Sequence, residues 1–341
     1  MMRRVLSYGL AAWLLVALTG CRREPVTREE GMPILFSTSA MQLSAPATRS
    51  SDDVPHTSEY LIADGRKIAV FGTWTSADGE STNVFSKMGV TCELQNDNSV
   101  KWVYSPLKYW PKNDGETISF FAYAPYKSDS NGIVEQSQPS ASGAPLIRYV
   151  LPDDENDQVD LLRAAPALAK TAFDGQVSFT FAHALSRIGV SAKTDASVLS
   201  GGSLVYLNSV SIEAGYPSSA ILDLGDGSWN YVQAGPSRAY SRDFGSTESG
   251  QSVGSTASPV FSGDNFVMCI PSDGLSVNLT VTYTVVTPDA ALASGKSVIV
   301  NTVDLSTSLN TISGKTHTIL LSISPDAVVF GTPSVSDWED A

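Results

Sequence analysis

Apolar and polar residues alternate along four segments of the chain, so that every second side chain is apolar. In residues 177–185 the apolar side chains of one parity are Val177, Phe179, Phe181 and Leu185. The same two-residue period runs through residues 204–212, 278–285 and 319–323. It is the period of a β-strand that packs one face on a core and turns the other to water. We therefore predict a strand in each of these segments.

Residues 118–123 are apolar at both parities, which is typical of a central strand that is covered on both faces. Clusters of Gly, Ser, Asn, Asp and Pro separate the strand patterns, as in residues 128–143 and 245–258, and these predict turns and loops. No segment after Cys21 keeps a helical period over a dozen residues. Many short strands without helices between them indicate an all-β fold built from β-sandwiches.

The first 20 residues have the order of a secretory signal: Arg3 and Arg4, then an apolar run over residues 5–18, then small residues. The run is shorter than the roughly 20 residues that a membrane-spanning helix needs. Leu18-Thr19-Gly20-Cys21 resembles a bacterial lipobox, in which the cysteine is lipidated and becomes the first residue of the mature chain. The alternatives are an ordinary signal peptide with a cysteine by chance, or a short membrane anchor.

The length of the chain suggests two domains, on a prior of about 150 residues for each. Loop composition at residues 173–175 marks the expected boundary between them. We therefore expect a signal peptide (1–20), a lipidated N-terminal segment and linker (21–58), an N-terminal β-sandwich domain (59–174) and a C-terminal β-sandwich domain (175–341).

Charge and cysteine content exclude several classes of function. The formal net charge is −13, and loss of Arg3 and Arg4 with the signal makes the mature chain more acidic. An acidic surface repels phosphates, so we expect no nucleic-acid partner. Cys92 and Cys269 lie in apolar surroundings, which favours buried thiols over a disulfide. No CxxC or HxxxH spacing is present, so we expect no metal and no cofactor.

No motif points to an enzyme, because the chain has no Gly-x-Ser-x-Gly elbow, Walker loop or HExxH. Of the three histidines, His183 and His317 share the apolar parity of their strands, so core or rim positions are favoured. The acidic run at residues 153–157 could offer oxygen ligands to Ca²⁺. It lacks the glycine and the distal glutamate of an EF-hand loop, so a solvated loop is favoured.

Five pieces of sequence resemble, in order, the fimbrillin (Mfa-like) family of fimbrial subunit lipoproteins from Bacteroides-type bacteria. They are residues 102–111 (WVYSPLKYWP), 118–125 (ISFFAYAP), 158–162 (QVDLL), 181–188 (FAHALSRI) and 335–338 (VSDW). The resemblance implies two transthyretin-like β-sandwich domains in tandem, lipoprotein export and assembly into fimbriae. Surface-exported lipoproteins of these bacteria often carry acidic residues after the cysteine, whereas this chain has Arg22-Arg23-Glu24. The anchor could therefore point outward or into the periplasm.

From this resemblance we expect a structural or adhesive subunit of a cell-surface fimbrium, held at the outer membrane by the lipid on Cys21. Its partners would be other fimbrial subunits and a ligand on a host or bacterial surface, and stalk, anchor and tip roles all stay open. One rival is a surface glycan-binding lipoprotein that does not polymerise, with Trp74, Trp102 or Trp110 as a stacking platform unless they pack in a core. The other rival is a secreted hydrolase whose site is assembled from distant residues.

Maturation is expected in the N-terminal segment. Residues 44–55 have loop composition and should be exposed, which is where proteases cut. Family members are similar in being cleaved after an arginine, so we predict cleavage between Arg49 and Ser50. Cleavage at Arg28 is less favoured because it lies closer to the lipid, and an uncut tether is the alternative.

Assembly is expected to proceed by donor-strand exchange, in which a terminal strand of one subunit completes the sheet of the next. The segment 327–335 is extended in character and partly apolar, and its candidate donor residues are Val328, Val329 and Phe330. Alternatively, this stretch is the last core strand of the C-terminal domain, with Trp338 as its terminal plug.

Overall fold

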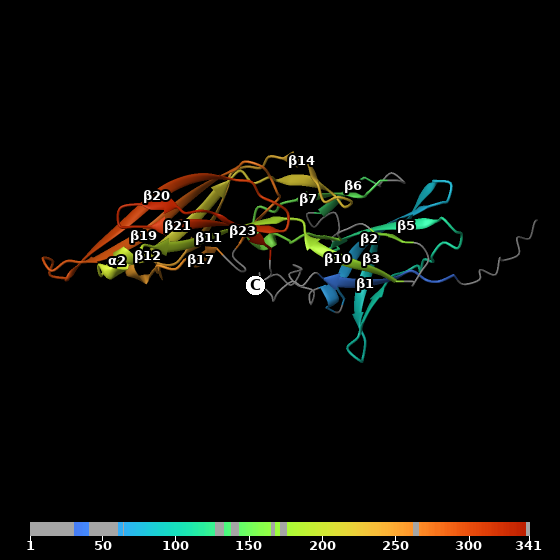
Figure 1. Ribbon diagram of the computed structural model, residues 1–341, viewed down its shortest axis with the longest axis horizontal. Helices are drawn as coiled ribbons and strands as arrows, with labels where there is room; N and C mark the ends of the chain where they lie inside the picture. Colours follow the sequence, from blue (N-terminus) through green and yellow to red (C-terminus); the bar gives the residue numbers. More distant parts are fainter. Residues whose placement is uncertain are drawn as a thin grey trace, which may run out of the picture. The chain divides into compact units, whose positions relative to one another are not determined.

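The computed structural model describes residues 31–40, 61–63, 65–126, 133–137, 143–164, 168–170, 176–261 and 266–338 (Figure 1). Strands make up most of these residues. The helical elements among them are short: η2 (Glu155–Asp157), α2 (Ala196–Ser200) and η3 (Thr247–Ser249), with residues 61 and 62 also helical. The predicted all-β class is therefore confirmed. No helix in the described ranges is long and apolar enough to cross a membrane.

The first sheet closes on itself. Its strands, in order of neighbours, are β2 (Lys67–Thr75), β3 (Ser81–Leu94), β4 (Val100–Val103), β1 (Leu35–Ala40), β10 (Gln176–His183), β8 (Leu162–Ala164), β5 (Thr117–Ala124) and β9 (Leu168–Lys170). β5 also pairs with β2, from Ala69↔Tyr123 to Thr75↔Thr117. The strands from β2 round to β5 therefore form a ring, and each of them has a partner on both sides.

Alternate side chains of the ring fill a first core. Phe120 on β5 and Phe179 on β10 belong to it. The opposite parity of β2 and β5, which includes Phe71 and Phe121, belongs to a second core. The prediction for residues 118–123 is confirmed, because β5 lies between the two cores and is therefore apolar on both faces.

Three further sheets contribute to the second core. A four-stranded sheet has the order β14 (Trp229–Gln233), β13 (Ser219–Asp223), β7 (Leu146–Val150), β6 (Ile133–Ser137). A six-stranded sheet has the order β17 (Ser258–Phe261), β11 (Ser186–Thr194), β21 (Lys315–Ile323), β22 (Val328–Phe330), with β18 (Val267–Cys269) beside β11 and β23 (Ser334–Asp337) beside β21. A five-stranded sheet has the order β15 (Arg238–Asp243), β12 (Leu204–Ala214), β19 (Leu275–Pro288), β20 (Lys296–Leu309), with β16 (Gln251–Ser252) beside β12. The six- and five-stranded sheets share one core, as in a β-sandwich.

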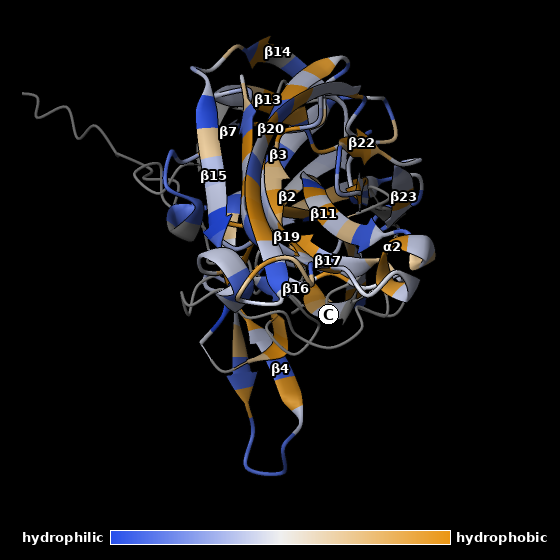
Figure 2. Ribbon diagram, turned by 90° about the vertical axis from the view of Figure 1, so that its left-hand side faces the viewer, coloured by the Kyte–Doolittle hydropathy of each residue, from blue (hydrophilic) through white to orange (hydrophobic). Residues whose placement is uncertain are grey.

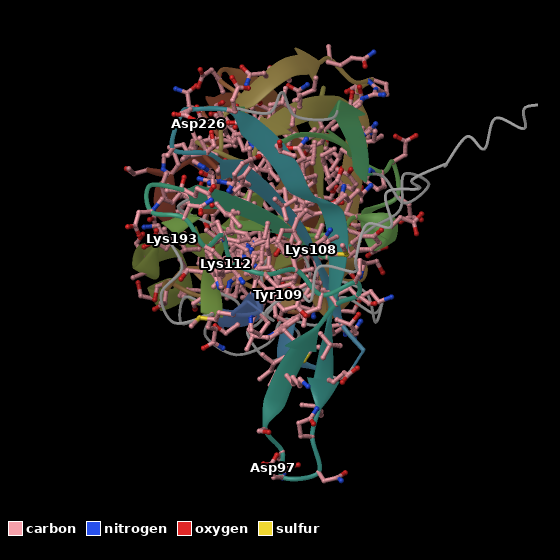
Figure 3. All side chains as sticks on the ribbon, turned by 90° about the vertical axis from the view of Figure 1, so that its right-hand side faces the viewer. Asp97, Lys108, Tyr109, Lys112, Lys193 and Asp226 are labelled. Atoms are coloured by element: carbon pink, nitrogen blue, oxygen red, sulfur yellow. The ribbon has the colours of Figure 1, made fainter. Side chains whose placement is uncertain are left out.

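The four segments with a two-residue period are strands, as predicted: β10, β12, β19 and β21. The hydrophilic turn at residues 95–99 joins β3 to β4 at the end of an exposed hairpin (Figure 2). Asp97 lies at the tip of that hairpin (Figure 3), where its Oδ1 accepts the Ser99 N–H at 2.9 Å. Hydrogen bonds from Ser99 lower the pKa of Asp97.

The predicted domain boundary at residues 174 and 175 does not coincide with the limits of the sheets. β10 follows the boundary, yet it pairs with β1 and β8 and contributes to the first core. β7 precedes the boundary, yet it pairs with β13 and contributes to the second core. The chain passes from the first core to the second between β10 and β11, where Ala184 and Leu185 belong to the second core. The division into two transthyretin-like domains stays a prediction.

The acidic run at residues 153–157 contacts β15. Arg238 Nη2 lies 2.5 Å from Asp153 Oδ1. Arg242 donates from both Nη atoms to the Glu155 carboxylate, at 2.9 and 3.0 Å. Opposite charges in a bidentate arrangement position this loop against the sheet. The predicted solvated loop is therefore ion-paired at two of its carboxylates. Among the described residues, no group of His, Cys, Asp or Glu is suited to a metal.

Candidate functional site

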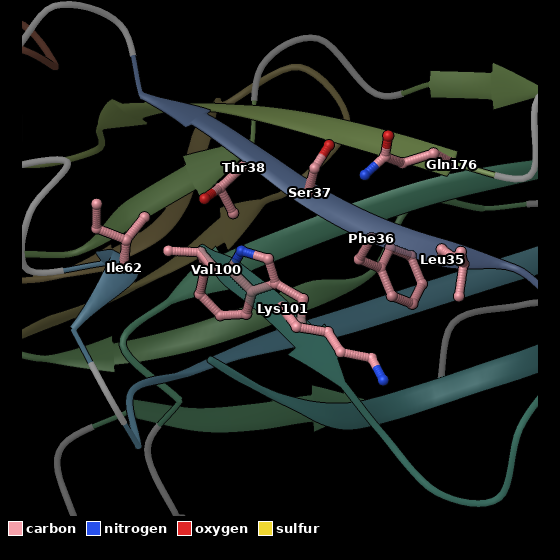
Figure 4. Close-up of a pocket in the computed structure, with 9 residues that line it drawn as sticks. Leu35, Phe36, Ser37, Thr38, Ile62, Val100, Lys101 and Gln176 are labelled. Carbon is pink, nitrogen blue, oxygen red and sulfur yellow. The ribbon is translucent and has the colours of Figure 1, made fainter. Parts of the chain in front are cut away.

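The strand β1 closes the ring of the first sheet. It runs parallel to β10, from Leu35↔Gln176 to Ala40↔Phe181. On its other side, Phe36 pairs antiparallel with Trp102 of β4. Figure 4 shows residues 35–38 of β1 beside Val100 and Lys101 of β4. Without β1, the ring would open between β4 and β10.

Pairing extends to the residues before β1. The Ile34 N–H donates to Lys108 O at 2.9 Å, and the Trp110 N–H donates to Met32 O at 3.0 Å. Lys108 and Tyr109 are labelled in Figure 3. Residues 32–40 therefore form one extended segment that exchanges backbone hydrogen bonds along most of its length.

Two side chains of this segment enter the first core. Ile34 is fully buried, and Phe36 is 3% exposed, whereas Leu35 between them is 44% exposed. The Phe36 ring lies among four aromatic rings, with centroid distances between 5.3 and 5.8 Å: Phe85, Tyr104, Phe120 and Phe179. Offset and edge-on aromatic pairs of this kind contribute about 0.5–1.5 kcal/mol each beyond their buried area. We call this group the aromatic box.

The motif at residues 102–111 contacts one side of β1. We call the position of β1 between β4 and β10 the β1 seat. Tyr104 Oη donates to Ile34 O at 2.7 Å, and burial raises the pKa of this phenol. Trp102 and Trp110 are buried in the first core, and Trp74 packs against it half-buried. The three tryptophans therefore pack in a core, the arrangement favoured over sugar platforms from the sequence.

A cavity of about 270 Å³ lies beside β1 (Figure 4). Its lining combines residues 35–38 of β1 with Ile62, residues 100–102 of β4, and Gln176 of β10. Among the described residues, its polar side chains are Ser37, Thr38, Lys101 and Gln176. The lining is therefore partly apolar, with Leu35, Phe36 and Ile62 beside the polar side chains.

The candidate donor residues lie at an edge of the six-stranded sheet. β22 pairs antiparallel with β21, from Leu321↔Phe330 to Ile323↔Val328. Val328 is buried, Val329 is 55% exposed and Phe330 is half-buried against the second core. The tail thus pairs within its own chain, as in the alternative that the sequence left open, and the donor role stays a prediction. Cys21, Arg49 and Ser50 lie outside the described residues.

Side chains from three of the sequence motifs lie together, because Asp160 and Trp338 both contact His183. His183, the last residue of β10, shares a 2.7 Å hydrogen bond between its Nδ1 and Asp160 Oδ2, and both side chains are buried. The Trp338 ring stacks on His183 at 4.3 Å. His317 is also buried, as expected, and its Nε2 accepts the Ile312 N–H at 3.1 Å. The partnership of Asp160 with His183 carried no signal in the sequence beyond the presence of both in motifs.

Neither Cys92 nor Cys269 is in a disulfide, and both thiols are buried. Burial raises the pKa of Cys269 to about 12, so this thiol is inert at neutral pH. The prediction of buried thiols rather than a disulfide is confirmed.

Residues 48–338 match the model of the family described as fimbrillin-like. This chain belongs to that family. The fimbrium subunit Fim1C of Phocaeicola vulgatus is 33% identical to the fimbrillin-like chain over 125 residues, which is 34% of this chain and 32% of the relative. The match therefore spans about a third of that relative's length. The resemblance identified from the sequence motifs is confirmed.

Solved structures share the fold of this fimbrillin-like chain. A fimbrial protein from Bacteroides vulgatus superposes with a TM-score of 0.66 at 19% identity, over 90% of this chain and 99% of that one. A candidate cell adhesion protein from Bacteroides ovatus gives a TM-score of 0.50 at 15% identity, over 91% and 98% of the two chains. At these identities the likeness concerns the fold alone.

Proposed function

We propose that this fimbrillin-like chain is a structural or adhesive subunit of a cell-surface fimbrium, and that it assembles by exchanging the strand in the β1 seat. One observation carries the proposal. β1 closes the ring, and it precedes the predicted cleavage site at Arg49 in the chain. After a cut there, β1 would be held by non-covalent contacts only.

Departure of β1 would create an acceptor for a strand. The backbone groups of β10 and β4 that pair with β1 would lose their partners, and an unpaired edge is a template for another strand. The aromatic box would lose the Phe36 ring at the same time. Main-chain hydrogen bonds would give an incoming strand affinity, and its alternate side chains would set the register.

The tail of another copy matches the seat in its apolar spacing. Ile34 and Phe36 enter the first core two residues apart, and Val328 and Phe330 have the same spacing and chemistry. We infer a register in which Phe330 occupies the aromatic box and Val328 takes the place of Ile34. Val329 would then occupy the exposed position of Leu35.

Assembly of purified variants tests this proposal. Wild-type protein should form a ladder of high molecular weight that survives mild SDS, with N-terminal sequencing of the ladder starting at Ser50. Phe330→Ala should abolish the ladder, whereas Val329→Ala, which changes the exposed neighbour, should leave it intact. Arg49→Ala should also prevent assembly, with Arg28→Ala as its matched control. A ladder whose subunits start at Cys21, or one that Phe330→Ala leaves unchanged, would overturn the mechanism.

We further infer that Cys21 carries the lipid of an outer-membrane lipoprotein. Support comes from the lipobox order Leu18-Thr19-Gly20-Cys21 behind a short apolar run. Several acyl chains on one residue anchor firmly, since each buried CH₂ contributes about 0.8 kcal/mol. Cys21→Ser should release or stall the protein, and membrane partitioning equal to wild type would refute the anchor.

A further inference from the structure

The last strand of the C-terminal tail, β23, is weakly held along its length. β22 and β23 together cover one edge of β21, whose other edge pairs with β11. All four residues of β23 are exposed, and Val335 is 57% exposed. Lys315 and Asp337 form an ion pair at the surface, where such pairs contribute little. β23 therefore has backbone pairing with water on both faces, which gives only a modest net stabilisation. β22 is held more firmly, because Val328 is buried in the second core and Phe330 packs against it.

Trp338, which follows β23 directly, is held differently. Trp338 is only 5% exposed, and its backbone N–H donates to Gly314 O at 2.9 Å. The ring stacks on the His183 ring with centroids 4.3 Å apart and planes 6° from parallel. The Arg187 guanidinium lies 4.3 Å from the centroid of the same ring. Stacking and a desolvated cation–π contact therefore act on one side chain at the end of an exposed strand.

The groups that receive this ring are themselves held in place. His183 is oriented by Asp160 through the buried 2.7 Å hydrogen bond. Arg187 Nε donates to Thr316 Oγ1 at 3.3 Å, and its guanidinium also lies 4.5 Å from the Phe266 ring centroid. The slot for Trp338 is therefore built by residues outside the tail, from β10, β11 and the residue before β18.

We propose that Trp338 is the latch that keeps the candidate donor tail in its own sheet, and that its withdrawal from the slot precedes donation. The proposal rests on the proposed function, because it concerns the release of the same tail. The contacts of Trp338 determine how often residues 328–337 separate from β21. His183 places the slot at the end of β10, the strand that also pairs with β1.

Hydrogen exchange of the full chain, followed by mass spectrometry, tests the latch without any need for assembly. Trp338→Ala should speed exchange of the amides in residues 328–337 by roughly tenfold or more, while β12 and β19 keep wild-type protection. Val335→Ala, on the same tail but at an exposed position, should match wild type. Trp338→Phe, which retains a stacking ring, should restore part of the protection.

Three results would overturn the latch. One is unchanged exchange of residues 328–337 in Trp338→Ala. Another is an equal rise in the exchange rate of these amides in Val335→Ala. The third is a uniform rise that includes β12 and β19, since Trp338 would then support the whole core rather than the tail. In the assembly assay, Trp338→Ala should form the ladder faster than wild type. Absence of a ladder in every variant would defeat the proposed function, whereas the exchange result would still decide the latch.

Discussion

Replacement of Phe36 by Ala tests whether β1 is seated through the aromatic box. The substitution removes a ring that is 3% exposed and lies between 5.3 and 5.8 Å, centroid to centroid, from four other rings. Truncation of a buried Phe to Ala costs about 3–5 kcal/mol, which combines lost transfer free energy with the cavity left behind. Such a loss is a large fraction of the roughly 5–15 kcal/mol that stabilises a typical domain.

Leu35→Ala is the matched control, because this neighbour on the same strand is 44% exposed. A surface substitution of this kind should change the free energy of unfolding by no more than about 0.5 kcal/mol. Equilibrium unfolding in urea, followed by tryptophan fluorescence, should show a lower midpoint for Phe36→Ala with an unchanged slope, and near wild-type behaviour for Leu35→Ala.

The same pair of variants can be compared after cleavage at Arg49, where β1 would be held without a covalent link. A loss of about 3–5 kcal/mol corresponds to a dissociation constant weaker by roughly a hundred- to several-thousandfold. The cut Phe36→Ala protein should therefore shed the N-terminal fragment on size-exclusion chromatography, and cut Leu35→Ala should retain it. Equal behaviour of the two variants in both assays would refute the assignment of β1 to the first core.

Two further predictions follow from burial. Phe179→Ala on β10 should cost about 3–5 kcal/mol in the same unfolding experiment, whereas Ser178→Ala on the opposite face should be nearly neutral; similar losses at both positions would mean that β10 does not pack one face in the core. Burial lowers the pKa of His317 below the usual histidine value of about 6.5, so the unfolded state takes up a proton more readily as the pH falls through that value. The free energy of unfolding should therefore decrease from pH 7 to pH 5, and the decrease should be smaller in His317→Gln; identical pH profiles would exclude His317 as the cause.

The strands β10, β12, β19 and β21 were predictable because their signal is local. A two-residue period reports that one face of a segment is buried, so residues 177–185 and 278–285 identified β10 and β19 without knowledge of their partners. Five short motifs in order were sufficient to indicate the fimbrillin-like family, and residues 48–338 match it. The donor role of Val328 and Phe330 stays a prediction.

Strand pairing was decided only by the tertiary structure. Backbone hydrogen bonds carry no side-chain code, so nothing local indicates that β1 runs parallel to β10, a strand some 140 residues further along. For the same reason the sequence did not indicate that β10, which follows residue 175, belongs to the first sheet. The meeting of Asp160, His183 and Trp338 has the same origin: each lies in a recognisable motif, but their contacts exist only because two cores bring three distant segments together. The sequence by itself therefore determined which residues are buried and which family they belong to, and the packing of the sheets decided which strand closes the ring and what holds the tail.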